Sequence, residues 1–297
     1  MIKILLLLLF LIIYAVFPLI RCAINNFPLT GCFGLVDLFH YFRYKMWNNA
    51  TCGELIAFCG LFGKGKTLSA VHLIVQRYKK YDGKRVYDKH RKKFVTQHVL
   101  ILSNVDLIGV PYIPFTSLQQ LVELSKKVKL VDKENDTLTY IYCLGDEFSV
   151  QLNSRNFAKN FDALFLNTLL TCRHYHISIF YTTQRFNQVD ALLRQVTQNV
   201  IECNKVWRFQ LQTCYDGYEL ENCVNPTLVQ PLNKSCWFIK NKDFACYDTL
   251  ACVSNLEKSI VDGDMISKGE IIAMQNTMPS DTVVRYSRKA KKRKRFK

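Results

Sequence analysis

Residues 54–67 read ELIAFCGLFGKGKT, and this stretch decides the fold. The apolar run at 54–59 predicts a short strand, and the residues after Thr67 predict a helix to about Lys80. Between them, Gly60 to Thr67 match the pattern G-x-x-x-x-G-K-[ST]. In a strand–loop–helix context this pattern indicates a phosphate-binding loop. The alternative, a plain glycine-rich turn, leaves Lys66 unexplained.

The chemistry of such a loop predicts its ligands. Glycines let backbone N–H groups wrap a phosphate, and the positive end of the following helix adds to the attraction. Lys66 would reach the β- and γ-phosphate oxygens, and the Thr67 hydroxyl would complete the shell of a Mg²⁺ ion. We therefore predict ATP and Mg²⁺ as ligands, with a nucleotide-binding set of Gly60, Leu61, Phe62, Gly63, Lys64, Gly65, Lys66, Thr67 and Leu68.

A second motif supplies acids for the same site. The apolar run at 141–144 ends in Gly145, Asp146 and Glu147, which places both carboxylates at the carboxyl edge of a parallel sheet, beside the phosphate loop. Asp146 would hold Mg²⁺ through water, and Glu147 would polarise the attacking water. The alternative is an exposed acidic turn.

A third segment ends in a polar residue that could serve this site. The strand predicted by the apolar run at 177–181 ends Tyr181-Thr182-Thr183-Gln184. Gln184 would stand beside Glu147 and orient the water or sense the γ-phosphate. An ordinary polar strand end is the competing interpretation.

The spacing of apolar runs predicts the fold class. Runs that are apolar throughout recur at 99–102, 138–144 and 177–181, and helix-like segments fall at 117–130 and 162–172. Such runs alternating with helices predict an α/β fold with a mostly parallel sheet covered on both faces, and the phosphate loop makes it a P-loop NTPase fold. We place this core at 54–204. Short aromatic and polar segments after it predict a small β-rich extension at 205–280.

The net charge of +16 is concentrated in two segments. Residues 285–297 carry nine basic and no acidic side chains, and residues 77–93 carry nine basic and two acidic ones, so the rest is neutral. We expect 281–297 to be a disordered tail in which 285–297 binds nucleic acid through its phosphates, a solvated tail or a nuclear localisation signal being the alternatives. The 77–93 patch would face anionic lipid headgroups, with DNA as the alternative.

The N-terminus predicts a membrane anchor. Residues 2–20 are apolar except for Lys3 and Pro18, and as one helix they would reach about 28 Å. We therefore expect a transmembrane helix at 1–21, a signal peptide being the competing interpretation. Arg21, Arg43 and Lys45 follow the span, which favours a single-pass protein with its body in the cytoplasm. Residues 22–53 would lie at the membrane interface or pack on the body.

Twelve cysteines suggest a disulfide framework, but their spacing does not support one. No C-x-x-C pair occurs, and Cys59 and Cys143 fall inside strand-like runs. Reduced, partly buried thiols in a cytosolic body are the expectation, although six cysteines between 203 and 252 leave pairing open there. Zinc is not expected, because the cysteines lack the paired short spacings of zinc sites.

The order of motifs resembles the zonular occludens toxin and inovirus gene I type of ATPase, in the FtsK–HerA group. The resemblance covers about 54–203 and rests on the phosphate loop, Leu102-Ser103-Asn104, Asp146-Glu147, Arg173-His174, Thr183-Gln184 and Asp190…Arg194. It implies a RecA/FtsK-like fold and a membrane-bound, virus-encoded ATPase. Its kin extrude filamentous virions or pump DNA, with coat or assembly proteins as partners. In the gene I type the membrane span follows the ATPase domain. Here it comes first, which puts the extracytoplasmic half of that function in doubt.

The resemblance also implies an arginine finger and an oligomer. Such an arginine reaches the γ-phosphate from a neighbouring subunit. Arg173 is the first candidate and Arg194 the second, while Arg155 and Arg185 lie near, and a surface arginine is the alternative for each. A finger makes the active unit an oligomer, a hexamer by resemblance.

Two functions remain open on the sequence. The first is a motor that couples ATP hydrolysis to virion assembly or DNA translocation. The second is a membrane-bound scaffold switched by nucleotide, with little turnover, that binds nucleic acid through its basic tail. Glu147 beside Asp146 favours the motor, since a switch does not need it.

Overall fold

The computed structural model describes residues 2–115, 118–147 and 170–248. Two compact units make up the chain, one of residues 1–49 with 86–94 and the other of residues 50–85 with 95–297. The second unit holds every described residue of the predicted nucleotide site.

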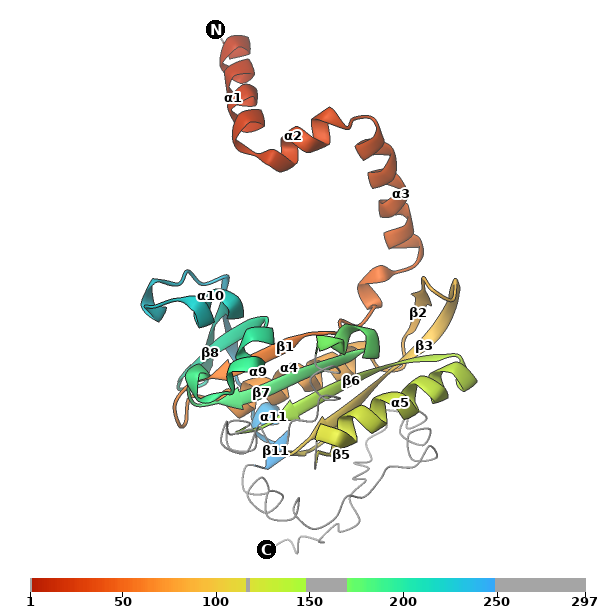
Figure 1. Ribbon diagram of the computed structural model, residues 1–297, viewed down its shortest axis with the longest axis vertical. Helices are drawn as coiled ribbons and strands as arrows, with labels where there is room; N and C mark the ends of the chain where they lie inside the picture. The colour runs from red at the N-terminus through yellow and green to blue at the C-terminus, as the bar shows by residue number, and fades with distance from the viewer. Residues whose placement is uncertain (1, 116–117, 148–169, 249–297) are drawn as a thin grey trace, which may run out of the picture. The chain divides into compact units, whose positions relative to one another are not determined.

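A mostly parallel sheet forms the body (Figure 1). Its order is β10-β9-β8-β1-β7-β6-β3-β2, and β5 pairs with β3 outside this path. The five strands β8, β1, β7, β6 and β3 run parallel to one another, so their carboxyl ends share one edge. The described strands of this sheet are β1 (Leu55–Cys59), β2 (Arg85–Asp88), β3 (Lys93–Ser103), β5 (Ile113–Pro114), β6 (Thr137–Gly145), β7 (Ile177–Thr183), β8 (Asn199–Val206), β9 (Phe209–Asp216) and β10 (Asn233–Phe238).

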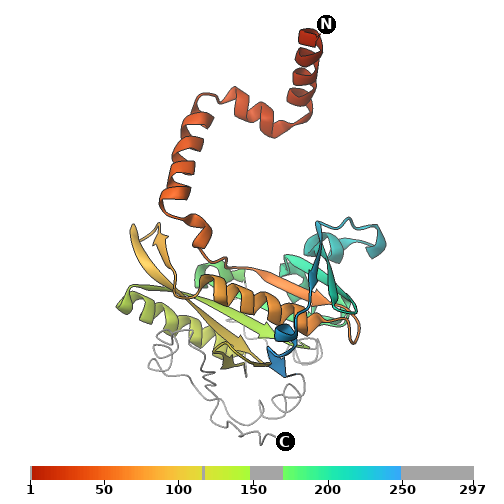
Figure 2. The ribbon, with the colours of Figure 1, turned by 180° about the vertical axis from the view of Figure 1, so that it is seen from behind.

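Helices cover both faces of this sheet, as the sequence predicts. α4 (Lys66–Tyr81) packs Ala70, Ile74 and Tyr78 on one face, in a core with Phe58 of β1. α5 (Leu118–Asn135) packs on the other face. Figure 1 shows α5 in front of the sheet, and Figure 2, from behind, shows α4 in front. The helix expected at 162–172 lies largely outside the described residues.

β9 and β10 extend the central sheet. β9 pairs antiparallel with β8, and β10 pairs antiparallel with β9. A boundary between residues 204 and 205 therefore falls inside β8. Farther along, β11 (Tyr247–Asp248) pairs with β4 (Asp106–Leu107). Residues 249–280 and the basic tail at 281–297 lie outside the described residues.

The N-terminal apolar run is two helices, so the expectation of one helix over residues 2–20 is wrong. α1 (Ile2–Val16) ends before Phe17, which is extended with φ −102° and ψ 102°. Pro18 is the cause, since a proline disfavours helical backbone in the residue before it and begins a new helix readily. The next helices are α2 (Pro18–Asn25) and α3 (Leu29–Arg43).

Within the described residues, no single helix is long and apolar enough to cross a membrane. By length and composition alone, α2 and α3 pass the test together, as a pair bent by 100°.

Candidate nucleotide-binding site

The phosphate loop connects β1 to α4 in a conformation that needs glycine. Gly63 and Gly65 have φ of +71° and +80°, which side chains rarely adopt. A Cβ on Gly60 would stand 2.8 Å from the carbonyl oxygen of Cys203. Gly65 caps α4 without any side-chain hydrogen bond to the first turn. The first N–H groups of this helix can therefore bind an anion.

The Lys66 side chain hydrogen-bonds to the same loop that would bind a phosphate. Its side chain is largely buried, and Nζ donates a hydrogen bond to the Leu61 carbonyl at 3.2 Å. The same Nζ lies 5.8 Å from the centre of the Phe62 ring. A γ-phosphate would replace a neutral carbonyl by a charged acceptor, which makes a stronger hydrogen bond. The ammonium group is thus already positioned at the loop.

One carboxylate oxygen connects three elements of the site. Asp146 Oδ1 accepts a hydrogen bond from the Thr67 hydroxyl at 2.7 Å and another from the Thr182 hydroxyl at 2.6 Å. Thr67 lies in α4, Asp146 follows β6, and Thr182 lies in β7. A hydroxyl and a carboxylate oxygen in contact are hard oxygen donors that suit Mg²⁺. The residues present therefore fit the predicted ion, whose shell phosphate and water would complete.

Asn104 fixes the backbone of Asp146. Its Nδ2 donates to the Asp146 carbonyl at 2.9 Å, and its Oδ1 accepts from the Asp146 N–H at 2.7 Å. Asn104 follows β3 and is buried. The resemblance includes Asn104 among its motifs, but the sequence alone does not assign it this pairing.

Glu147 and Gln184 reach the same edge of the sheet. Glu147 has a φ of +50°, and its N–H donates to the Thr182 hydroxyl at 2.9 Å. Gln184 follows β7, whose last residue pairs in register with Cys59 at the end of β1. Because β7 lies between β1 and β6, Gln184 stands between the phosphate loop and the acids. Both residues therefore follow neighbouring strands at the edge of the sheet that carries the phosphate loop.

The phosphate loop is braced by the β8–β9 hairpin, which sequence reasoning missed. Gln210 in β9 is fully buried, and its Nε2 donates to the Lys64 carbonyl at 3.0 Å. Lys64 Nζ donates to Asn204 Oδ1 in β8 at 2.9 Å. A Cβ on Gly65 would collide with the Gln210 amide. These contacts span more than 100 residues of sequence, so no local pattern announces them.

Two buried thiols, those of Cys59 and Cys203, lie beside the loop. Burial raises the pKa of the Cys203 thiol to about 11 and holds that of Cys59 well above its usual range. Thiols with raised pKa stay protonated at neutral pH and behave as small apolar groups. Cys59 and Cys203 therefore pack the sheet beneath the loop.

Arg173 lies at the opposite edge of the sheet from the phosphate loop. It belongs to η2 (Cys172–Tyr175), just before β7 begins, and a Cβ on Gly53 would stand 2.8 Å from its Cβ. Gly53 in turn precedes β1. Arg173 is exposed, so a finger role requires a neighbouring subunit whose phosphate edge meets this rim.

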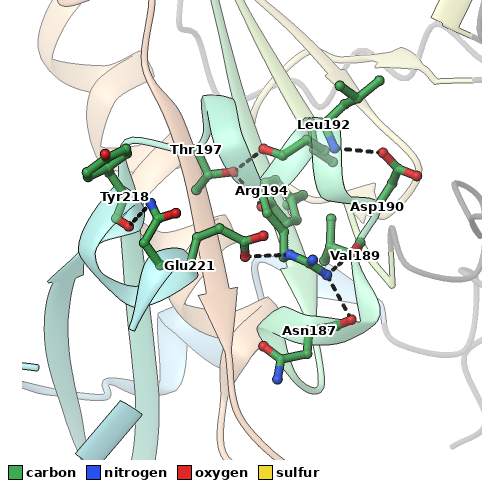
Figure 3. A network of polar contacts seen from close by, with 11 residues as sticks. Asn187, Val189, Asp190, Leu192, Arg194, Thr197, Tyr218 and Glu221 are labelled. Atoms are coloured by element: carbon green, nitrogen blue, oxygen red, sulfur yellow. Dashed lines mark hydrogen bonds and ion pairs between the residues drawn. The ribbon is translucent and has the colours of Figure 1, made fainter. Parts of the chain in front are cut away.

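Arg194 is engaged within its own chain (Figure 3). Its Nε donates to Glu221 Oε2 at 2.6 Å, and Nη1 donates to the Asn187 and Val189 carbonyls at 3.0 and 2.8 Å. The pair joins α9 (Ala191–Val196) to α10 (Gly217–Asn222). An arginine with these partners has a structural role, and as a finger it would have to release all three.

Arg185 is the arginine that the structure leaves at the phosphate edge. It follows Gln184 and is exposed, and no ion pair of its side chain is found among the described residues. Arg155 lies outside the described residues.

Among comparisons with known proteins, the comparison with solved structures finds similar folds. No protein-family profile matches the sequence, and no curated protein does. The N-terminal domain of zonular occludens toxin from Neisseria meningitidis aligns with a TM-score of 0.44 and 16% identity, over 67% of this chain and 100% of that chain. B204, the DNA-packaging ATPase from Sulfolobus turreted icosahedral virus, aligns with a TM-score of 0.38 and 12% identity, over 64% of this chain and 98% of that chain. EssC (ATPases 2 and 3) from Geobacillus thermodenitrificans aligns with a TM-score of 0.37 and 12% identity, over 70% of this chain and 43% of that chain.

Thr182→Val tests the shared carboxylate. This substitution keeps the shape but removes the hydroxyl, so Asp146 loses one donor and the Glu147 N–H loses its acceptor. We expect Mg²⁺-dependent ATP hydrolysis to fall about 10- to 100-fold, as for other residues that orient metal ligands. Thr182→Ser restores the hydroxyl and should restore most of the activity. Equal activity of the valine and serine variants, measured across a Mg²⁺ titration, would contradict this role.

Arg194→Ala separates a structural arginine from a finger. Loss of three charge-assisted hydrogen bonds should cost about 2 kcal/mol or more of unfolding free energy. For a body of this size that is roughly 4–8 °C in melting temperature. Glu221→Ala should lower the melting temperature by a similar amount. A finger would instead leave both melting temperatures unchanged while abolishing turnover, and differential scanning calorimetry of the two variants distinguishes these outcomes.

Proposed function

We propose that this chain binds MgATP and hydrolyses it. The observation that carries the proposal is the contact of Thr67 and Thr182 with one oxygen of Asp146, with Glu147 next in the chain. A protein that only binds nucleotide needs the loop and the metal ligands. It does not need a second carboxylate held beside them by its own backbone hydrogen bond.

Each group has a distinct task in the proposed reaction. The open N–H groups of the loop and Lys66 bind the phosphates and compensate their charge. Thr67 and Asp146 would hold Mg²⁺, which supplies charge neutralisation to the β- and γ-oxygens when bound. Glu147 accepts the proton of the attacking water, and Gln184 positions that water.

A motor at a membrane is the cellular role that we propose for this activity. The support is the motif order, which resembles ATPases that extrude virions or pump DNA, together with the apolar N-terminal helices. Leu19, Phe33 and Phe39 expose between 65% and 86% of their surface, as expected of helices that meet lipid. In this proposal the body lies in the cytoplasm, the active unit is a hexamer, and residues 285–297 bind nucleic acid.

The basic patch of residues 77–93 is partly used inside the protein. Arg77 forms an ion pair with Glu54 at 2.7 Å and lies over the Phe180 ring, so it does not face a partner. Exposed basic side chains lie at the end of α4, at Lys79 and Lys80, and on the β2–β3 hairpin, which carries Arg85, Lys89, His90, Lys92 and Lys93.

The hairpin also contains an aromatic cluster that ties it to the end of the N-terminal helices. Tyr44 stacks on Tyr87 with ring centroids 4.0 Å apart, and Phe94 lies 5.4 Å from Tyr87. Cations beside aromatic rings are typical of surfaces that meet anionic headgroups. We propose such a contact for this hairpin.

A membrane-bound scaffold switched by nucleotide is the second candidate. The exposed N-terminal helices and the basic segments would serve it equally well. The backbone hydrogen bond that places Glu147 argues for turnover, and the measurement below decides between the two.

Glu147→Gln distinguishes hydrolysis from binding. The amide keeps the shape and the backbone contacts but cannot accept a proton, so we expect the rate of ATP hydrolysis to fall at least 100-fold. Affinity for a fluorescent ATP analogue should stay within about threefold, since the phosphate contacts remain. Lys66→Ala is the matched control, and it should abolish binding. Unchanged turnover in Glu147→Gln would contradict the mechanism and favour the scaffold.

Removing charge from the hairpin tests the membrane surface. Lys89→Gln with Lys92→Gln should weaken partition of the full chain onto anionic vesicles about 30-fold, at roughly 1 kcal/mol for each charge. Partition onto neutral vesicles should not change. The matched control is Lys126→Gln with Lys133→Gln, both exposed on α5. Equal partition of the two double variants in a vesicle flotation assay would exclude the hairpin as the contact.

A further inference from the structure

The tip of the β8–β9 hairpin exposes an aromatic cluster made of Trp207, Phe209 and Phe238. The three side chains expose 71%, 44% and 45% of their surface. Their ring centroids lie 5.5–6.0 Å apart in tilted and edge-to-face arrangements. Phe209 and Phe238 face each other across β9 and β10, and Trp207 packs on both. Apolar surface gathered in this way indicates a contact site.

The turn itself does not require a tryptophan. Trp207 has a φ of +53°, in the left-handed region that glycine and asparagine adopt most easily in hairpin turns. A bulky aromatic residue at this position is unusual. Its ring projects from the tip over Phe209 and Phe238. The Trp207 side chain therefore forms part of the exposed aromatic surface and is not needed for the turn conformation.

Cations lie on the same hairpin as the aromatic cluster, around a further ring at the end of α11 (Asn241–Phe244). The Lys205 ammonium and the Arg208 guanidinium each lie 6.0 Å from the Phe244 ring, which is itself 44% exposed. Lys240 and Lys242 are exposed beside it.

Two acids of this region, Asp243 and Glu202, form hydrogen bonds within the chain. Asp243 accepts the Lys240 N–H at 2.7 Å and contacts His72 at 3.2 Å. Glu202 accepts the Tyr215 hydroxyl at 3.4 Å. The surface of the tip is therefore aromatic and positive, which suits an anionic partner with flat apolar groups.

The tip stands at the edge of the sheet where the nucleotide is expected. β8 runs parallel to β1, and Glu202 pairs in register with Cys59, the last residue before the phosphate loop. Residues 203–206 of β8 continue past that level toward the tip. The same hairpin holds the loop through Asn204 and Gln210. Whatever binds the tip is therefore next to the phosphate loop.

We propose that this tip binds single-stranded nucleic acid, with bases stacked on Trp207 and phosphates paired with Lys205 and Arg208. Stacking on aromatic rings beside cations is how proteins hold unpaired strands without reading their sequence. A duplex keeps its bases stacked inside, so it offers no flat face to the cluster. The inference rests on the proposed function in one respect, since it names the contact of the motor's cargo. A second copy of the chain would bring the same positive charge and is disfavoured for that reason.

Trp207→Ala in the full chain tests the proposal against a 20-nucleotide oligo(dT) probe in fluorescence anisotropy. Loss of one stacking partner should weaken binding roughly 5- to 150-fold. Trp207→Phe keeps a ring and should stay within about threefold. Tyr218→Ala removes another exposed aromatic side chain, at α10, and should have no effect. Binding of a duplex, which phosphate contacts dominate, should change less than twofold or so in any of these variants.

Several outcomes would overturn the proposal. Equal oligo(dT) affinity of Trp207→Ala and the parent chain would do so, as would an equal loss for single strand and duplex. A changed mass in light scattering would assign the tip to contacts between copies. Weaker vesicle partition with unchanged oligo(dT) binding would assign it to the membrane. Without nucleic acid, Trp207→Ala should hydrolyse ATP at the same rate as the parent chain. The ATPase proposal is tested by Glu147→Gln, so its failure can be told apart from failure of the proposal for the tip.

Discussion

The nucleotide site depends on one carboxylate oxygen that two hydroxyls share. Asp146 Oδ1 receives the Thr67 hydroxyl from the helix that follows the phosphate loop and the Thr182 hydroxyl from the neighbouring strand. A buried carboxylate is costly unless hydrogen bonds satisfy it, so this oxygen fixes how α4, β6 and β7 meet. Asn104 completes the arrangement by pairing with the Asp146 backbone. In the sheet β7 lies between β1 and β6, so this oxygen joins neighbouring elements at one edge.

The same edge of the sheet is also held from the other side. Gln210 and Asn204 connect the phosphate loop to the β8–β9 hairpin, so two independent sets of side chains determine the loop. One set belongs to the acids and the other to the antiparallel extension. The extension is thus part of the site, although its strands come after the motifs in the sequence. A change at the tip of the hairpin has a short path to the loop.

Local patterns predicted the central part of the fold, and contacts distant in sequence decided the rest. The phosphate loop, the acid-ended strand and the covering helices are encoded in runs of five to fifteen residues or so, where periodicity and glycine spacing are informative. Thr182 and Gln210 act through partners at least 35 residues away, which no local pattern indicates. Arg194 was predicted as a finger candidate from a motif, yet its partner Glu221 lies 27 residues further on. The helix break at Pro18 could have been predicted, since proline disfavours helical backbone in the residue before it. The long apolar run around it instead favoured a single helix.

β1 is a short strand through which a pull on the chain would reach the phosphate loop. It has five residues, about 16 Å of extended chain, and it is the only backbone between Glu54 and the phosphate loop. Tension between the N-terminal helices and a bound nucleotide would therefore run along this strand. Hydrogen bonds to β7 and β8 flank β1 on both sides, and a pull along its length loads them together rather than one after another. The strand that carries the nucleotide motif is therefore also the element through which a pull on the chain before Glu54 would reach the phosphate loop.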